Sequence, residues 1–441
     1  MATIAPFQAI RYNAHKVGDL SKVVSQPYDR VRYGLQDRYY DLHKYNVVRI
    51  TKGREHPNDT PTDNVYTRAR DYFHTWLDAG YMLRDPAPGL YVYHQTFTLP
   101  DGSVLTRRAF IAALELVEFS EGIVLPHERT LSGPKVDRLN LMRATSTNFG
   151  QIFMLYPDTE NRINAIFDTA IAGRQPDADV REMFEQDVRQ QLWVVNDPRV
   201  IAQVVAEMAP KRGLIIADGH HRYETALNYR AEMREQFPDA PANAGFDFRM
   251  VTLVSLDDPG LTILPTHRLM HSYTAKTSAQ ILADAAEYFQ VTAHTDSAAL
   301  MDALAAGAEG GRCIGMYDGS YHLLQLKSPE IMAQIAPDHV EEWRLLDVTI
   351  LHELLIERIM GISKEQVEAK ANIDYYRDMD DAIAKVDAGE AQWVFIMNPT
   401  RMSEVKACSD KGAKMPQKST DFYPKVITGL TAMAVGETEQ L

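Results

Sequence analysis

The chain has 441 residues, of which 45% are hydrophobic and 24% are charged. This length exceeds what one hydrophobic core usually organises, and the ordinary composition excludes wholesale disorder, so we expect two or three domains. The formal net charge of −14 disfavours nucleic acid as a partner, because polyanions are repelled unless a local basic groove is present. Two cysteines, Cys313 and Cys408, supply neither a disulfide framework nor a structural zinc site.

Targeting signals are not evident in the sequence. Residues 1–10 lack the basic and apolar regions of a secretory signal, and no stretch approaches the roughly 18 apolar residues of a membrane span. We therefore expect a cytoplasmic protein with no membrane partner. The oligomeric state is left open, a homo-oligomer included.

In the first half of the chain, hydrophobic spacing predicts alternating strands and helices. Residues 46–50 look like a short buried strand, and a helix is expected from Asp63 to Gly80. The runs 90–97 and 104–113 flank an Asp-Gly turn, which predicts a hairpin. The elements expected next lie at 152–156, 161–172, 192–195, 199–208, 213–217, 222–237 and 248–256.

The second half mixes the two element types as well. We expect strands, a hairpin and helices at 260–268, 277–289, 297–304, 313–326, 345–360 and 393–397, with a last helix from Met402. This mixture predicts an α+β fold. The domains are expected to cover residues 1–270, as the catalytic core, and 271–441, as a C-terminal α/β domain that returns a tail segment to the site.

The strongest candidate site is the strand, turn and helix start at 214–226. Backbone N–H groups at a helix start are unpaired and form an anion site, to which Gly219 gives close access. Arg222, His220 and His221 add positive charge, so phosphate is the expected ligand. Asp218 could hold Mg²⁺ or orient a hydroxyl; the alternative is that it only caps the helix.

A second candidate is the polar, loop-rich stretch at 125–145. His127 and Glu128 offer a proton acceptor, and Lys135 and Arg138 offer cations for phosphate. These are the groups that phosphoryl transfer to a hydroxyl requires. The alternative is a surface loop held by ion pairs.

Two further segments, 264–268 and 415–425, supply candidates for binding the substrate, with a purely structural role expected about equally often. Transfer between anionic substrates needs more cations than one turn provides, so we expect the 127–138 loop and the 415–425 tail to face the same cavity as Asp218. The substrate-binding candidates are His267, Arg268, Lys418, Ser419, Thr420 and Lys425.

Five ordered motifs resemble those of the prokaryotic family catalogued as domain of unknown function 1015. The match spans nearly the whole chain, and several common signatures, such as the P-loop and the dinucleotide-binding glycine motif, are absent. The motifs lie at 26–29, 126–138, 218–222, 264–268 and 415–420.

The Asp-Gly-His-His-Arg segment is similar to the nucleotide-phosphate motif of the ParB/sulfiredoxin superfamily, especially that of archaeal free serine kinases. This resemblance implies a ParB/sulfiredoxin-like, nucleotide-binding core over 1–270, and places Asp218, His220, His221 and Arg222 on the phosphate and catalytic motif. It implies a phosphotransferase that uses ATP or ADP with a small hydroxylated metabolite, best matched by L-serine or O-phosphoserine, in either direction. Such nucleotides normally need Mg²⁺.

The role of Glu128 as general base is inferred from local chemistry alone, because the kinases' own glutamate motif has no counterpart here. Two alternatives remain open. One is a metal-dependent phosphohydrolase that uses His127, Glu128, His220, His221 and Glu224 as ligands. The other is a ParB-like nucleotide-binding switch that recognises DNA or a partner protein, against which the net charge counts.

Overall fold

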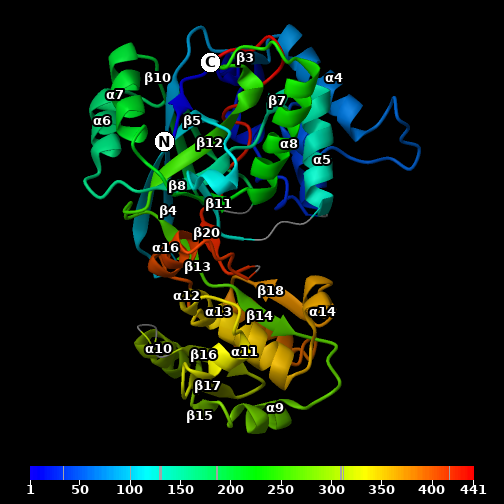
Figure 1. The fold of residues 1–441 in the computed structure, drawn as a ribbon. Helices are drawn as coiled ribbons and strands as arrows, with labels where there is room; N and C mark the ends of the chain where they lie inside the picture. Colours follow the sequence, from blue (N-terminus) through cyan, green and yellow to red (C-terminus); the bar gives the residue numbers. More distant parts are fainter. Residues whose placement is uncertain are drawn as a thin grey trace. The chain divides into compact units, whose positions relative to one another are not determined.

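The structure, a computed structural model, divides into two units, which are described separately (Figure 1). The described residues are 1–32, 34–99, 101–128, 132–184, 187–307, 310, 312–416 and 418–441, without the side chains of Ser132 and Pro134. The first unit comprises Met1–Pro126, Thr130–Thr262 and Pro424–Leu441, and the second comprises His127–Arg129 and Ile263–Tyr423.

Within the described residues of the first unit, nine strands form one mixed sheet. Its order is β6-β11-β8-β12-β5-β4-β10-β9, with β1 added beside β5. The pairs β11–β6 and β12–β8 are parallel and the other pairs are antiparallel. The strands of the unit are β1 (Ile4–Ala5), β2 (Ile10–Tyr12), β3 (Met82–Arg84), β4 (Leu90–Thr98), β5 (Val104–Glu115), β6 (Val124–Pro126), β7 (Thr147–Asn148), β8 (Ile152–Tyr156), β9 (Ala178–Arg181), β10 (Arg189–Val195), β11 (Leu214–Asp218), β12 (Phe248–Ser255) and β21 (Met433–Ala434).

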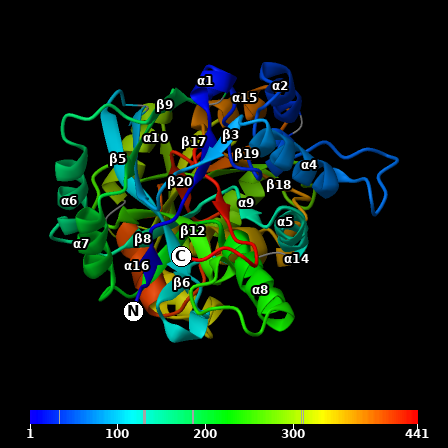
Figure 2. The same cartoon turned by 90° about the horizontal axis from the view of Figure 1, so that it is seen from above.

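Helices pack on this sheet through apolar faces. Phe110 and Leu253 of the sheet share one core with Phe167, Val204 and Ala226 of the helices. Helices α6 and α7 lie side by side, as do α5 and α8 (Figures 1 and 2). The helices are α1 (Ala14–Val17), η1 (Leu20–Lys22), α2 (Leu35–Leu42), α3 (Val48–Thr51), α4 (Val65–Asp78), η2 (Phe119–Glu121), α5 (Ser132–Thr145), α6 (Arg162–Ile171), α7 (Pro198–Met208), α8 (His220–Gln236) and η3 (Gly245–Asp247).

The C-terminal segment, residues 424–441, belongs to the first unit. Strand β21 pairs with β7, and Thr428 and Ala432 form backbone bridges with Ser25 and Ile10. The side chain of Ile427 is 1% exposed. Apolar burial and backbone pairing therefore draw the end of the chain into the first unit, whereas the expected boundary had assigned it to the second domain.

The second unit is built on an antiparallel sheet of order β15-β17-β16-β19-β14-β18. Adjacent side chains of one strand point to opposite faces, so Met270 and Leu269 of β14 enter two different cores. Its elements are β13 (Thr262–Leu264), β14 (His267–Met270), α9 (Ser278–Ala285), β15 (Phe289–His294), α10 (Ser297–Gly307), β16 (Cys313–Tyr317), β17 (Tyr321–Leu326), α11 (Ile331–Ile335), α12 (Glu341–Arg344), α13 (Asp347–Thr349), the π-type helix η4 (Ile350–Ile359), α14 (Lys364–Glu368), β18 (Ile373–Tyr376), α15 (Met379–Asp387), β19 (Trp393–Ile396), α16 (Met402–Asp410) and β20 (Asp421–Tyr423).

Strand β14 explains where the units divide. It pairs with β18 and β19 inside the second sheet, so the chain enters the second unit at Ile263. The sequence predicts this boundary later, at residue 271. The mixed α and β content confirms the predicted fold class. Among the described residues, no helix is both long enough and apolar enough to cross a membrane.

Most predicted elements are confirmed, including the hairpin β4–β5 and the helix α4. The strand expected at 46–50 is wrong, because Val48–Thr51 forms the short helix α3 with Val48 and Ile50 buried. A short apolar run fits a buried strand and a buried helical turn equally well. The loop expected around Lys135 and Arg138 is also wrong, since both residues lie on α5.

We expect Ile427→Ala to lower the free energy of unfolding by about 2–5 kcal/mol, because it leaves a cavity under the C-terminal segment. Met183→Ala is the control, since Met183 is 50% exposed and its loss should change stability by no more than about 0.5 kcal/mol. Urea unfolding of the full chain measures both. Equal effects of the two variants would show that the C-terminal segment does not pack in the first unit.

Candidate functional site

The turn between β11 and α8 can be made only with glycine at its centre. Gly219 has φ +101°, and a Cβ atom there would lie 2.9 Å from Nε of Arg222. Helix α8 begins at His220, which is 6% exposed, and among the described residues no side chain caps this end. The start of a helix is in general a favourable position for an anion, because its backbone N–H groups point outward and carry the positive end of the helix dipole.

Asp218, at the end of β11, lies among cations of the first unit. Arg222 donates a hydrogen bond to its Oδ2 atom, and Nζ of Lys425 lies 3.6 Å from Oδ1. The side chains of Arg222 and Lys425 are only 7% and 9% exposed. Burial raises the pKa of Asp218, but the charges of Lys425, Arg222, Arg30 and His220 outweigh it and hold the pKa well below its usual range.

Arg222 is fixed on more than one side. Its Nη1 donates to the carbonyl oxygen of Gln151, while Asp218 and then Asp29 favour its charged form against the effect of burial. Burial, together with Asp29, raises the pKa of the neighbouring Tyr28 to about 12, so Tyr28 stays neutral. The position of the Arg222 guanidinium is thus set before any ligand arrives.

Helix α5 places two more predicted cations in the first unit. Lys135 forms a 2.6 Å ion pair with Glu224 of α8, and Arg138 pairs with Asp137 and lies 4.0 Å from the ring centre of Tyr28. Burial lowers the pKa of His221, which favours the neutral imidazole. Of the predicted phosphate-binding residues, Gly219 and Arg222 thus meet at the turn, and Arg138 joins them through Tyr28.

The predicted base and part of the tail come together in the second unit. Nε2 of His127 lies 2.9 Å from Oγ1 of Thr420, and its carbonyl oxygen accepts the N–H of Met415. Glu128 forms a backbone bridge with Met415, and its side chain is 26% exposed. Residues 129–131 and Gln417 of the two motifs lie outside the described residues.

The remaining substrate-binding candidates have partners inside the second unit. His267 accepts the N–H of Met397 through Nδ1, and burial lowers the pKa of His267 to about 4. Arg268 donates to the carbonyl oxygen of Lys418, at 3.0 Å, and Oγ of Ser419 donates to that of Pro416. These bonds hold the local backbone, and a role in substrate binding stays a prediction.

Sequence reasoning missed Arg249 and Asn148, two buried polar residues of the first unit. Arg249 is 3% exposed and Asn148 is 1% exposed. Neither belongs to a motif. The available signal was a lone arginine in the otherwise apolar strand expected at 248–256.

Mg²⁺ held directly by Asp218 does not fit the residues present. Both carboxylate oxygens already face cations, and Arg30 adds a further positive charge, so a divalent ion would meet strong repulsion. In the described part of the chain, no three His, Cys, Asp or Glu side chains gather as a metal site. The phosphohydrolase alternative requires such a cluster.

We expect Asp218→Asn to lower the free energy of unfolding at pH 7 by about 3 kcal/mol, because it leaves two buried cations without their counter-ion. The low folded-state pKa of Asp218 means that this stabilisation is complete above its ordinary pKa of 3.8 and shrinks as the pH falls below it. Urea unfolding at pH 7, 5 and 3 measures the difference.

Asp168→Asn is the matched control, because Asp168 pairs with Arg108 at 3.2 Å but is 47% exposed. It should cost about 1 kcal/mol or less. A loss in Asp218→Asn no larger than in this control would contradict the buried ion-pair network.

Several solved structures are similar to this chain at low identity. A conserved hypothetical protein from Pyrococcus furiosus has 14% identity and a TM-score of 0.33, covering 70% of this chain and 92% of that one. A free serine kinase in complex with AMP has 14% identity and a TM-score of 0.34, covering 72% and 90%. SbnI from Staphylococcus aureus, truncated at its C-terminus, has 9% identity and a TM-score of 0.35, covering 75% and 89%. At these TM-scores the likeness assigns no ligand to this chain.

No curated protein matches the sequence. Residues 4–349 match the family described as "Protein of unknown function (DUF1015)", as the five motifs predicted. Because the match covers well over half of the 441 residues, the chain belongs to this family.

Proposed function

We propose that the protein is a nucleotide-dependent phosphotransferase that acts on a small hydroxylated metabolite. The observation that carries the proposal is the turn at 218–222, where the buried side chains of Arg222 and Lys425 are held on one carboxylate before the start of α8. A polyanionic phosphate group matches this combination of cations and the start of a helix.

The local charge balance supports an anionic ligand. Arg222, Lys425 and Arg30 act on Asp218, and Asp29 is the second acid whose charge reaches Arg222. Phosphoryl oxygens would place negative charge beside these cations. The similarity of the 218–222 motif to the nucleotide-phosphate motif of free serine kinases makes the same assignment from the sequence.

The residues divide the chemistry between them. Asp218 stays ionised and is a poor base, because its pKa is low, so it serves to position Arg222 and Lys425. These two cations stabilise the charge that spreads over the phosphoryl oxygens during transfer. Glu128, with His127, is the proposed acceptor of the proton from the substrate hydroxyl.

Serine and O-phosphoserine are the substrates that the motif similarity favours. A serine hydroxyl is a weak nucleophile at neutral pH, so its attack on a phosphoryl group needs a positioned base. Transfer from a nucleotide to serine and transfer from phosphoserine to ADP pass through the same transition state. The proposal therefore covers both directions.

Phosphorus NMR of the full chain with Mg²⁺, incubated with serine plus ATP, serine plus ADP, or phosphoserine plus ADP, tests the reaction. We expect at least one of these pairs to be converted, and Glu128→Gln to slow the conversion by about 10²–10⁴-fold, the usual effect of losing a general base. Glu232→Gln is the control, because Glu232 pairs with Arg143 at the surface and is 40% exposed. Conversion of none of these pairs would refute the substrate class, and a normal rate in Glu128→Gln would refute the base.

A further inference from the structure

A cavity in the first unit borders Arg222, and Tyr28 and Arg138 of two other motifs also line it. It holds about 40 Å³, and we call it the arginine cavity after the three arginines in its wall. One water needs about 10–15 Å³ by this measure, so a carboxylate or phosphoryl group fits. The polar residues that carry the argument are Tyr28, Arg138, Asn148, Arg222 and Arg249.

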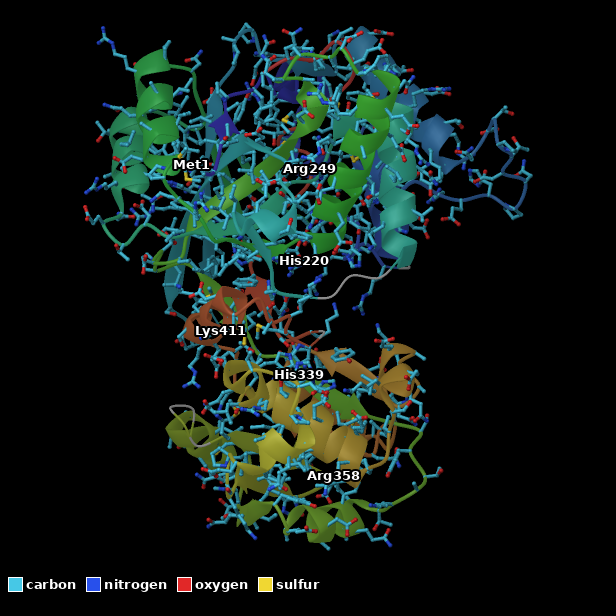
Figure 3. The ribbon with its side chains drawn as sticks, viewed as in Figure 1. Met1, His220, Arg249, His339, Arg358 and Lys411 are labelled. Carbon is cyan, nitrogen blue, oxygen red and sulfur yellow. The ribbon has the colours of Figure 1, made fainter. Side chains whose placement is uncertain are left out.

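Arg249 is the arginine of this cavity that lacks a counter-ion. Arg222 pairs with Asp218, and Arg138 pairs with Asp137, but no carboxylate among the described residues pairs with Arg249. Its Nη2 donates to the carbonyl oxygen of Gly150 at 2.6 Å, whereas its Nε has no hydrogen-bond partner within the described chain. Figure 3 labels Arg249 in the interior of the unit.

The charge on Arg249 persists despite this burial. Burial and the charges of Arg222 and Arg138 lower the pKa of Arg249 to about 9, which still leaves it protonated at neutral pH. A buried charge without a counter-ion is unfavourable by several kcal/mol. Water in the cavity could accept the Nε–H but would bring no negative charge.

Asn148 is a second residue of the cavity wall whose buried polar atoms lack hydrogen-bond partners among the described residues. Its backbone is held by the pairing of β7 with β21, opposite Met433. Both the Nδ2 and the Oδ1 atom of its buried side chain lack a partner in the described part of the chain. Most buried amides are satisfied, and a group that offers an acceptor oxygen, with a hydroxyl or ammonium donor beside it, would satisfy this one.

The geometry points to a site for a small oxyanion group in the arginine cavity, bound by Arg249 and Asn148. The group is the carboxylate or the phosphoryl group of the acceptor substrate, and this role, unlike the binding itself, rests on the proposed function. Arg222 touches both the cavity and Asp218, so an anion bound here would lie one side chain away from the phosphate turn.

Calorimetric titration of the full chain with inorganic phosphate, L-serine and O-phosphoserine, without nucleotide, tests the site. Binding of phosphate and phosphoserine but not serine would identify a phosphoryl site. Binding of serine and phosphoserine but not phosphate would identify a carboxylate site. Binding of all three would support the oxyanion site without a preference, and binding of none would overturn it.

Two variants locate the binding. Arg249→Met replaces an unpaired buried charge with an apolar chain of similar length, so it should fold and weaken binding at least tenfold. Asn148→Asp places a carboxylate in the cavity, so it should raise the melting temperature and abolish binding. Arg234→Met is the control, because Arg234 pairs with Asp247 in the same unit and is not among the residues that line the cavity.

Unchanged affinity in both cavity variants would overturn the inference. If Arg249→Met failed to fold, unchanged affinity in Asn148→Asp alone would overturn it. Two further outcomes distinguish a failure of the cavity site from a failure of the proposed phosphotransferase function. Anion binding that depends on Arg249, without any turnover, would leave the cavity site and remove the phosphotransferase. Turnover with an unchanged KM for the acceptor in Arg249→Met would leave the phosphotransferase and show that the cavity does not bind the acceptor.

Discussion

Asp218 must keep its negative charge in a largely buried position, and much of the first unit serves that requirement. Arg222 on α8 and Lys425 on the C-terminal segment both neutralise it. Two chain segments far apart in the sequence, residues 218–222 and the C-terminal segment, therefore meet at one carboxylate. Gly219 is needed because any side chain there would collide with Arg222, and Ile427 anchors the segment that carries Lys425.

This arrangement separates binding from proton transfer. A carboxylate whose pKa is held low by its neighbours is a fixed counter-ion, so the proton acceptor has to be sought elsewhere. Glu128 and His127 belong to the second unit, where His127 contacts Thr420 and Glu128 pairs with Met415 through its backbone.

The sequence predicted best those elements that a single local pattern determines. Hydrophobic spacing located α4, and an Asp-Gly turn located the hairpin β4–β5. The strand-turn-helix motif located Asp218 and Arg222, which the turn at Gly219 brings into contact. The 415–425 tail was expected near Asp218, and Lys425 lies there.

What the sequence could not predict depends on distant contacts. Val48 and Ile50 are buried equally well by a strand or a helical turn, and packing decided for α3. Arg249 and Asn148 become candidates for ligand binding only because they line the cavity beside α5, α8 and the C-terminal segment. The tail is divided between the units, with Lys418 in the second and Lys425 in the first, and the local composition does not indicate this division.

Calorimetric titration of the full chain with ADP tests the central claim, that the cations held on Asp218 bind phosphate. The account predicts that ADP binds and that Lys425→Gln weakens it at least about tenfold, as expected for loss of a charged hydrogen bond. Lys211→Gln should bind normally, because Lys211 is a similarly buried lysine of the first unit that pairs with Asp158 instead. No binding by the wild type, or equal affinity in Lys425→Gln, would contradict the account.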